Sequence, residues 1–141
     1  MKIHVVTEGQ EVIENFKKVV SKNNSLDLSG ISDNECDTIM ANDALDTFTI
    51  DEIEKLLTSL AKKLRLTGTM VIGGTDIRLL AKSIINDQMD DLQASRLISS
   101  LASATSLDAL VRTVGSLGLN VVSTQISGIH YEATVRRGQN E

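Results

Sequence analysis

The chain has 141 residues, which is close to the size of one compact domain, and we expect a single domain over residues 1–141. It carries 14 Lys and Arg against 19 Asp and Glu, and only 2% of its residues are aromatic. Nucleic-acid binders need a basic face or stacking platforms, so no nucleic-acid partner is expected. The apolar runs fall far short of the roughly 20 residues that cross a bilayer, so no membrane partner is expected either.

The start of the chain, Met1-Lys2 followed by Ile3-His4-Val5-Val6, lacks the pattern of a signal peptide, and a cytoplasmic location is expected. A single cysteine, Cys36, excludes an internal disulfide and a cysteine-rich zinc site. The two histidines, His4 and His130, stand alone on strand-like segments. We favour a structural role for both, and we expect no metal site.

In the first part of the chain, Ile3–Val6 predicts a short strand and Thr7-Glu8-Gly9 a turn. Apolar residues then recur at helical spacing, which predicts a helix over 12–20. A brief strand is expected at Leu26–Leu28.

The next predicted unit is a strand, a helix and a second strand. The first strand covers Cys36–Ala41, and Thr49 with Glu52 matches a capping box that starts a helix near Ile50. Thr67-Gly68 is expected to end that helix. Residues 69–72 then form a buried strand, which Gly73-Gly74-Thr75-Asp76 ends.

Three helices and a hairpin are predicted for the rest of the chain. Helical spacing covers 77–85, continues over 92–101 with Asp90 or Asp91 as a cap, and returns after Ser106 until Gly118. Residues 119–125 and 129–135 read as two strands around Ser127-Gly128. Strands that alternate with helices predict an α/β fold: a mainly parallel sheet, helices on both faces, and a C-terminal antiparallel β-hairpin.

Any site should lie outside the carboxyl ends of the strands, where residues 7–10, 42–46 and 73–76 are expected to converge. Asp43 and Asp46 could hold a polar substrate or act as a base, although turn and capping roles are commoner for such residues. Gly73-Gly74-Thr75-Asp76 either lets a ligand approach the backbone or turns the chain into the next helix. Carboxylates of Glu8, Asp43, Asp46 and Asp76 at one rim would suit a cationic ligand or divalent ion better than a phosphate.

From Cys36 onward the chain resembles the class I S-adenosylmethionine-dependent methyltransferases. Residues 36–48 are similar to that family's Phe-Asp-x-Val-x strand and the His-x-Leu-Glu-His-like segment after it, best at Leu45 and Asp46. Residues 64–72 are similar to its Leu-x-Pro-Gly-Gly turn and strand, without the proline, and residues 107–137 resemble its closing helix and hairpin. The resemblance implies a Rossmann-like fold and S-adenosylmethionine as the cofactor of an active member.

The family's Gly-x-Gly-x-Gly loop is replaced here by Thr7-Glu8-Gly9-Gln10, whose side chains would occupy the space that the methionine part of the cofactor needs. Asp27 is the stand-in for the acidic residue that holds the ribose hydroxyls. The resemblance therefore suggests first a reduced, degenerate domain without a cofactor, which binds a protein partner or a second copy as a binding or assembly module. Small versions of this kind resemble proteins of tailed-phage genomes, which implies an accessory or virion protein.

The alternative is an active methyltransferase with an atypical cofactor loop. In that case the cofactor-binding residues are Glu8, Gly9, Asp43, Gly73 and Gly74, and Asp46 and Asp76 bind the substrate. Catalysis would rest mostly on proximity and orientation.

Overall fold

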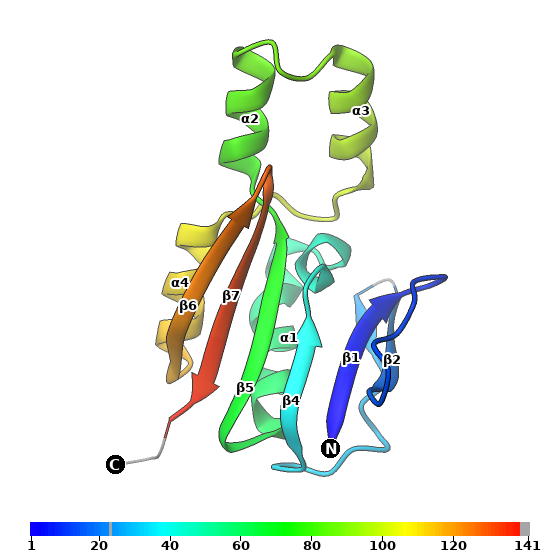
Figure 1. Cartoon of the computed structure of the whole chain (residues 1–141), viewed down its shortest axis with the longest axis vertical. Coiled ribbons are helices and arrows are strands. Elements are labelled where there is room, and N and C mark those ends of the chain that lie inside the picture. Colours follow the sequence, from blue (N-terminus) through cyan, green and yellow to red (C-terminus); the bar gives the residue numbers. More distant parts are fainter. Residues whose placement is uncertain (23, 139–141) are drawn as a thin grey trace.

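The computed structural model describes residues 1–22 and 24–138. It contains a seven-stranded sheet with the strand order β3-β2-β1-β4-β5-β7-β6 (Figure 1). Along the chain the elements are β1 (Lys2–Thr7), β2 (Lys17–Lys22), β3 (Ser25–Leu26), β4 (Cys36–Ala41), the short 3-10 helix η1 (Ala44–Thr47), α1 (Ile50–Lys63), β5 (Leu64–Thr75), α2 (Ile77–Ile85), α3 (Asp91–Ser100), α4 (Leu107–Ser116), β6 (Leu119–Ser127) and β7 (His130–Arg137).

The centre of the sheet is parallel, because β1 pairs in parallel with β2 and β4, and β4 pairs in parallel with β5. Strand β7 is antiparallel to both β5 and β6, and β3 is antiparallel to β2. The predicted α/β fold with a mainly parallel sheet and a C-terminal hairpin is therefore confirmed, and the fold is Rossmann-like. No helix among the described residues is long and apolar enough to span a membrane.

The helices that cover the sheet, α1 and α4, lie behind it on one face in Figure 1. Side chains of α1, such as Leu57 and Leu60, share one buried core with Val114 of α4 and Tyr131 of β7. Helices on both faces were expected. The second face has no covering helix because residues 8–16 link β1 to β2 without one.

The connection 8–16 instead covers the other face of β1. Ile3 joins the core on the α1 side, and alternation along the strand directs Lys2 and His4 to the opposite face. There Phe16 packs edge-on against His4, with 6.5 Å between ring centroids, and the Lys2 ammonium lies over the Phe16 ring. The segment 8–16 therefore links β1 to β2 in the place where a crossover helix would otherwise lie.

The helix predicted over 12–20 is wrong, because Lys17–Lys22 forms strand β2 beside β1. Val19 pairs with Val5 in the parallel ladder and is buried. Two β-branched residues at 19 and 20 fit a pleated strand at least as well as a helix, so pairing with β1 overrides the spacing. The brief strand expected at 26–28 overlaps β3 only at Leu26, where β3 ends.

Helix α1 begins at Ile50 as predicted, but the Thr49 side chain makes no capping hydrogen bond. Its end differs from the prediction, because α1 stops at Lys63 and β5 starts at Leu64. Thr67 and Gly68 therefore lie inside β5, at an irregularity in the register with β4. Strand β5 also continues through Gly73 and Gly74 instead of ending before them.

The remaining helices match the sequence closely. Asp90 and Gln93 form a reciprocal capping box at the start of α3, and the Ser106 hydroxyl accepts from the Ala109 amide at the start of α4. Gly118 follows α4 with a φ of +77°, a conformation that costs glycine least. These boundaries depend on local capping chemistry, which the sequence displays directly.

Candidate functional site

An open cleft of about 510 Å³ lies where the carboxyl end of β4 meets the start of β7, on the face of β1 that carries His4. Antiparallel pairing sets His130 opposite Thr75, and so brings the start of β7 to the carboxyl end of the parallel strands. Two of the three segments expected to converge, 7–10 and 42–46, contribute to it. Its lining residues are His4, Gln10, Ile13, Asn42, Asp43, Ser127, His130 and Glu132.

A hydrogen-bonded group of side chains forms one wall of this cleft. The His130 Nε2 atom lies 2.8 Å from Asp43 Oδ1 and 3.0 Å from the Asn42 carbonyl oxygen. Asn42 Nδ2 donates to Glu132 Oε1 over 3.2 Å. With two carboxylates, this wall suits a cationic or hydrogen-bond-donating ligand, and the His130–Asp43 pair can hold or pass a proton.

His4 forms the base of the cleft and is buried, with 6% of its surface exposed. Its Nδ1 atom accepts a hydrogen bond of 3.1 Å from the Ile13 amide, which places the proton of the neutral ring on Nε2. Burial lowers the pKa of His4, and the negative charge of Asp43 opposes this effect. His4 is therefore a neutral residue that ties the 8–16 connection to β1.

Two of the predicted carboxylates are engaged elsewhere. Asp46 accepts hydrogen bonds from the backbone amide and the hydroxyl of Thr75, both 2.8 Å long. Asp76 is buried and caps two helices, because it accepts from the Arg78 and Leu79 amides of α2 and from the Leu107 amide of α4. Both side chains therefore stabilise the end of β5 and the starts of the helices that pack beside it.

Gly73 and Gly74 are sites of close packing inside β5. A Cβ atom on Gly73 would collide with the Tyr131 carbonyl oxygen and lie 2.6 Å from the Asn42 carbonyl oxygen. On Gly74 it would lie 2.8 Å from Asp46 Oδ1. Of the two alternatives considered for residues 73–76, the turn into the next helix is confirmed at Asp76, which is the N-cap of α2. Gly73 and Gly74 themselves lie within β5, where neighbouring backbone and η1 take the space that a ligand would need.

The turn after β1, residues 7–10, is held by hydrogen bonds between its own residues. Gly9 adopts a φ of +83°, and the Gln10 amide donates to the Thr7 carbonyl oxygen over 3.1 Å. The Gln10 side chain folds back, so that Oε1 accepts from the Thr7 amide over 3.1 Å. Glu8 is exposed at the tip of this turn and does not line the cleft.

The four carboxylates expected at one rim are therefore not assembled there, because only Asp43 reaches the cleft. In the described part of the chain, no group of three or more His, Cys, Asp or Glu side chains is placed to hold a metal ion. The end of β2 carries Ser21, whose hydroxyl lies 2.7 Å from that of Thr47. Asp27 lies after β3, exposed and hydrogen-bonded to Ser29.

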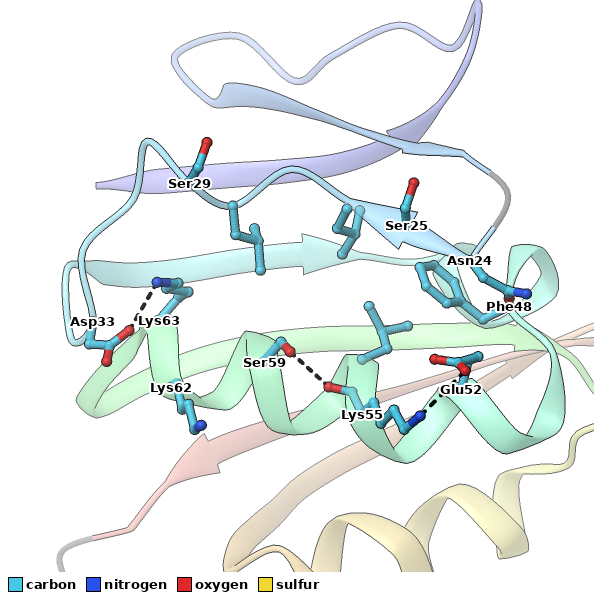
Figure 2. A pocket seen from close by; sticks show the side chains of 13 residues that line it. Asn24, Ser25, Ser29, Asp33, Phe48, Glu52, Lys55, Ser59, Lys62 and Lys63 are labelled. Atoms are coloured by element: carbon cyan, nitrogen blue, oxygen red, sulfur yellow. Dashed lines mark hydrogen bonds and ion pairs between the residues drawn. The ribbon is translucent and has the colours of Figure 1, made fainter.

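A second hollow, of about 580 Å³, separates α1 from the segment 24–33 (Figure 2). Leu26, Leu28, Phe48 and Leu56 contribute apolar surface to it. Charged groups on its rim pair with each other, Lys63 with Asp33 at 2.9 Å and Lys55 with Glu52 at 3.5 Å (Figure 2). This hollow offers an apolar surface but no set of groups suited to acid–base or nucleophilic chemistry.

Sequence reasoning placed residues 42–46 at the site but missed His130, Glu132 and His4 as members of the same cleft. The two histidines are far apart in the chain, and only the β5–β7 pairing brings His130 beside Asp43. The one available signal is the alternation of apolar and polar residues after residue 129, which puts His130 and Glu132 on the face opposite Tyr131.

The sequence matches no family profile, and no curated protein is significantly similar to it. Solved structures do resemble its fold. A SAM-dependent methyltransferase from Archaeoglobus fulgidus aligns with a TM-score of 0.64 and 14% identity, over 94% of this chain and 75% of that one. One from Methanosarcina mazei gives 0.60 and 9%, over 93% and 71%.

A third similar structure is a methyltransferase of Haloferax volcanii in complex with the methyltransferase activator Trm112 (TM-score 0.61, 11% identity, over 92% of this chain and 65% of that one). The chain also spans 60% of the length of a Pyrococcus horikoshii protein, PH0226. At these identities the similarity shows the fold alone. The chain thus has the fold of the class I SAM-dependent methyltransferases.

Proposed function

We propose that this chain is a reduced methyltransferase-fold domain that does not bind S-adenosylmethionine and acts as a binding or assembly module. The observation that carries this proposal is the closed turn at residues 7–10. A cofactor held at this end of the sheet needs backbone amides that it can reach, and glycines that allow the approach. Here the Thr7 amide already donates its hydrogen bond to the Gln10 side chain.

The end of β2 supports the same conclusion. A carboxylate there could accept hydrogen bonds from the ribose hydroxyls, but the last residues of the strand are Ser21 and Lys22. The Ser21 hydroxyl is engaged with Thr47, and Asp27 lies on the exposed segment beyond β3. The residues present at the ends of β1 and β2 therefore do not fit the cofactor.

Protein binding is the role proposed for the scaffold. The sheet and core are complete around α1 and α4, so the domain offers a stable framework whose surfaces can be used by a partner or a second copy. In the Haloferax complex, a protein of the same fold is bound to an activator protein. The resemblance to tailed-phage proteins makes an accessory or virion assembly the setting that we propose.

A second candidate function is favoured by one observation, the His130–Asp43 pair in the open cleft. If the turn at 7–10 opened, an active methyltransferase could use Glu8, Gly9, Asp43, Gly73 and Gly74 toward the cofactor, and Asp46 and Asp76 toward the substrate. This function would require Asp46 and Asp76 to give up their present hydrogen bonds.

Isothermal titration with S-adenosylmethionine and S-adenosylhomocysteine separates the two functions. The Archaeoglobus methyltransferase, titrated in parallel, serves as the positive control. We expect no saturable heat with this chain at millimolar ligand. Micromolar binding, worth about −8 kcal/mol, would refute the proposal and favour the active enzyme.

A further inference from the structure

Hydrogen-bond acceptors outnumber donors on the wall of the cleft between β4 and β7. The acceptors are the carboxylates of Asp43 and Glu132 and the backbone carbonyl oxygen of Asn42. Against them, a neutral His130 ring supplies one N–H group, and the Asn42 amide supplies the bond to Glu132. Asn42 Oδ1 is also buried without a partner among the described residues. A ligand that brings several N–H groups would satisfy this wall.

The negative charge of the wall has no fixed counter-charge. No Lys or Arg lines the cleft. Within the described part of the chain, the ion-pair contacts of Asp43 and Glu132 are with His130, at 2.8 Å and 3.9 Å. Both carboxylates remain partly exposed to the cleft, with side chains 47% and 29% accessible. They therefore favour a ligand whose N–H groups carry a positive charge.

The base of the cleft has the opposite need. His4 is buried, and its Nδ1 atom accepts from the Ile13 amide, so the neutral ring carries its proton on Nε2. No hydrogen bond to another described residue uses that N–H group. A buried donor without a partner costs free energy, which an acceptor on a ligand would recover. The ligand should therefore carry an acceptor oxygen close to its cationic group.

These two needs together select one chemical class. A lysine ammonium or an arginine guanidinium group has donors only and leaves His4 without an acceptor. A free amino acid has an acceptor, but its carboxylate adds a negative charge beside Asp43 and Glu132. The amino terminus of a peptide carries an α-ammonium group with a neutral carbonyl oxygen next to it. The cleft is open, so the rest of such a chain can leave toward solvent.

We propose that this cleft binds the amino terminus of a partner's polypeptide chain. Asp43 and Glu132 hold the α-ammonium group, and His4 Nε2 donates to the first carbonyl oxygen. Capture of a chain terminus by a few convergent polar groups is a known mode of peptide recognition. The inference rests on the proposed function, because it names the group through which a protein partner contacts the binding module. It involves binding alone, and no covalent bond forms or breaks.

Isothermal titration of the full chain with tetra-alanine amide, whose amino terminus is free, tests the proposal. We expect saturable binding with a dissociation constant near or below about 1 mM. The matched ligand is the same peptide with an acetylated amino terminus, which keeps every carbonyl group and loses the positive charge. It should bind at least about tenfold more weakly. Equal binding of the two peptides, or no binding of either, would overturn the inference.

Two smaller ligands test the other parts of the proposal. n-Butylamine has an ammonium group without a neighbouring carbonyl oxygen and should bind at least about fivefold more weakly than the peptide. Equal binding would refute the role of His4. Alanine amide has both groups but no following chain, and it should also bind more weakly. If it binds as tightly as the peptide, the site takes a small amino-acid amide, and the peptide partner is refuted.

An amino-acid substitution locates the binding site. Asp43→Asn removes the charge but keeps an oxygen that can accept from His130, and it should weaken binding of the free peptide about tenfold. Glu54→Gln on α1 is the control, because it removes the same charge from an exposed residue that does not line the cleft. Thermal midpoints verify that both variants fold. Equal effects of D43N and E54Q would show nonspecific attraction and overturn the inference.

Failure of this inference is distinct from failure of the proposed function, which the cofactor titration reports. If neither the peptide nor S-adenosylmethionine binds, the amino-terminus site is refuted and the module without a cofactor stands. If both bind, the chemistry assigned to the cleft stands and the proposed loss of the cofactor is refuted.

Discussion

Two parallel connections in this sheet are built very differently. Between β4 and β5 the chain forms α1, whose Ile53, Leu56, Leu57 and Leu60 are buried against the sheet. Between β1 and β2 it forms only the segment 8–16, which is largely exposed and is tied to β1 through His4 and Ile13.

This difference is consistent with the proposal that the chain keeps the methyltransferase fold without binding the cofactor. The β4–β5 connection forms the core with α4 and β7, so changes there would cost stability. The β1–β2 connection contributes little to that core and is free to close on its own polar groups. A scaffold can thus keep its topology after the segment that would bind a cofactor has changed.

The largest difference between the two connections is expected for side-chain truncation. Leu57→Ala leaves a cavity under α1 and should lower the free energy of unfolding by about 2–5 kcal/mol. Ile13→Ala removes a side chain that is 41% exposed and should cost less than about 1 kcal/mol. Urea denaturation measures both, and equal losses would show that 8–16 is as integral as α1.

A smaller loss in the free energy of unfolding is expected for Gly73→Ala in β5. The new methyl group meets the backbone of Tyr131 in β7 and of Asn42 just after β4, and it should cost about 1–3 kcal/mol in the same measurement. Gly115→Ala is the control, because its Cβ meets nothing within 4 Å in α4. That control should gain about 0.5–1 kcal/mol, and a tolerated G73A would mean that the strands can separate.

The smallest effect concerns the pH dependence of the β1–β2 connection. Since the pKa of folded His4 lies below its ordinary 6.5, the unfolded chain binds the proton first as the pH falls through that value. Stability should therefore decline as the pH falls below 6.5. His4→Asn keeps an acceptor for Ile13, and thermal unfolding at pH 7.5 and 5.5 should show a weaker decline. If H4N loses as much stability between pH 7.5 and 5.5 as the native chain, groups other than His4 cause the decline.

Sequence patterns predicted the second half of the molecule better than the first. Ser106, Asp90 and Gly118 mark helix ends through local chemistry, and the alternation after residue 129 identifies the last strand. The helix prediction for residues 12–20 was wrong because Val19 and Val20 fit a helical spacing. The strand that they form instead depends on pairing with β1, which no local pattern shows.

The candidate site was predictable only in part. Strand ends placed Asp43 correctly at the carboxyl edge of the sheet, because that position depends on topology alone. The contact of Asp43 with His130 depends on strand register, and the roles of Asp46 and Asp76 depend on which backbone amides lie near them. No local pattern carries that information.

We propose that the chain itself fills the place where a cofactor would contact β1. The most direct test is a nuclear magnetic resonance titration that follows the backbone amide signals of Thr7, Glu8, Gly9 and Gln10 while S-adenosylmethionine is added to millimolar concentration. We predict that these signals do not move. Saturable shifts confined to this turn and to Asn42 and Asp43 would show that the cofactor binds there, and would contradict the account.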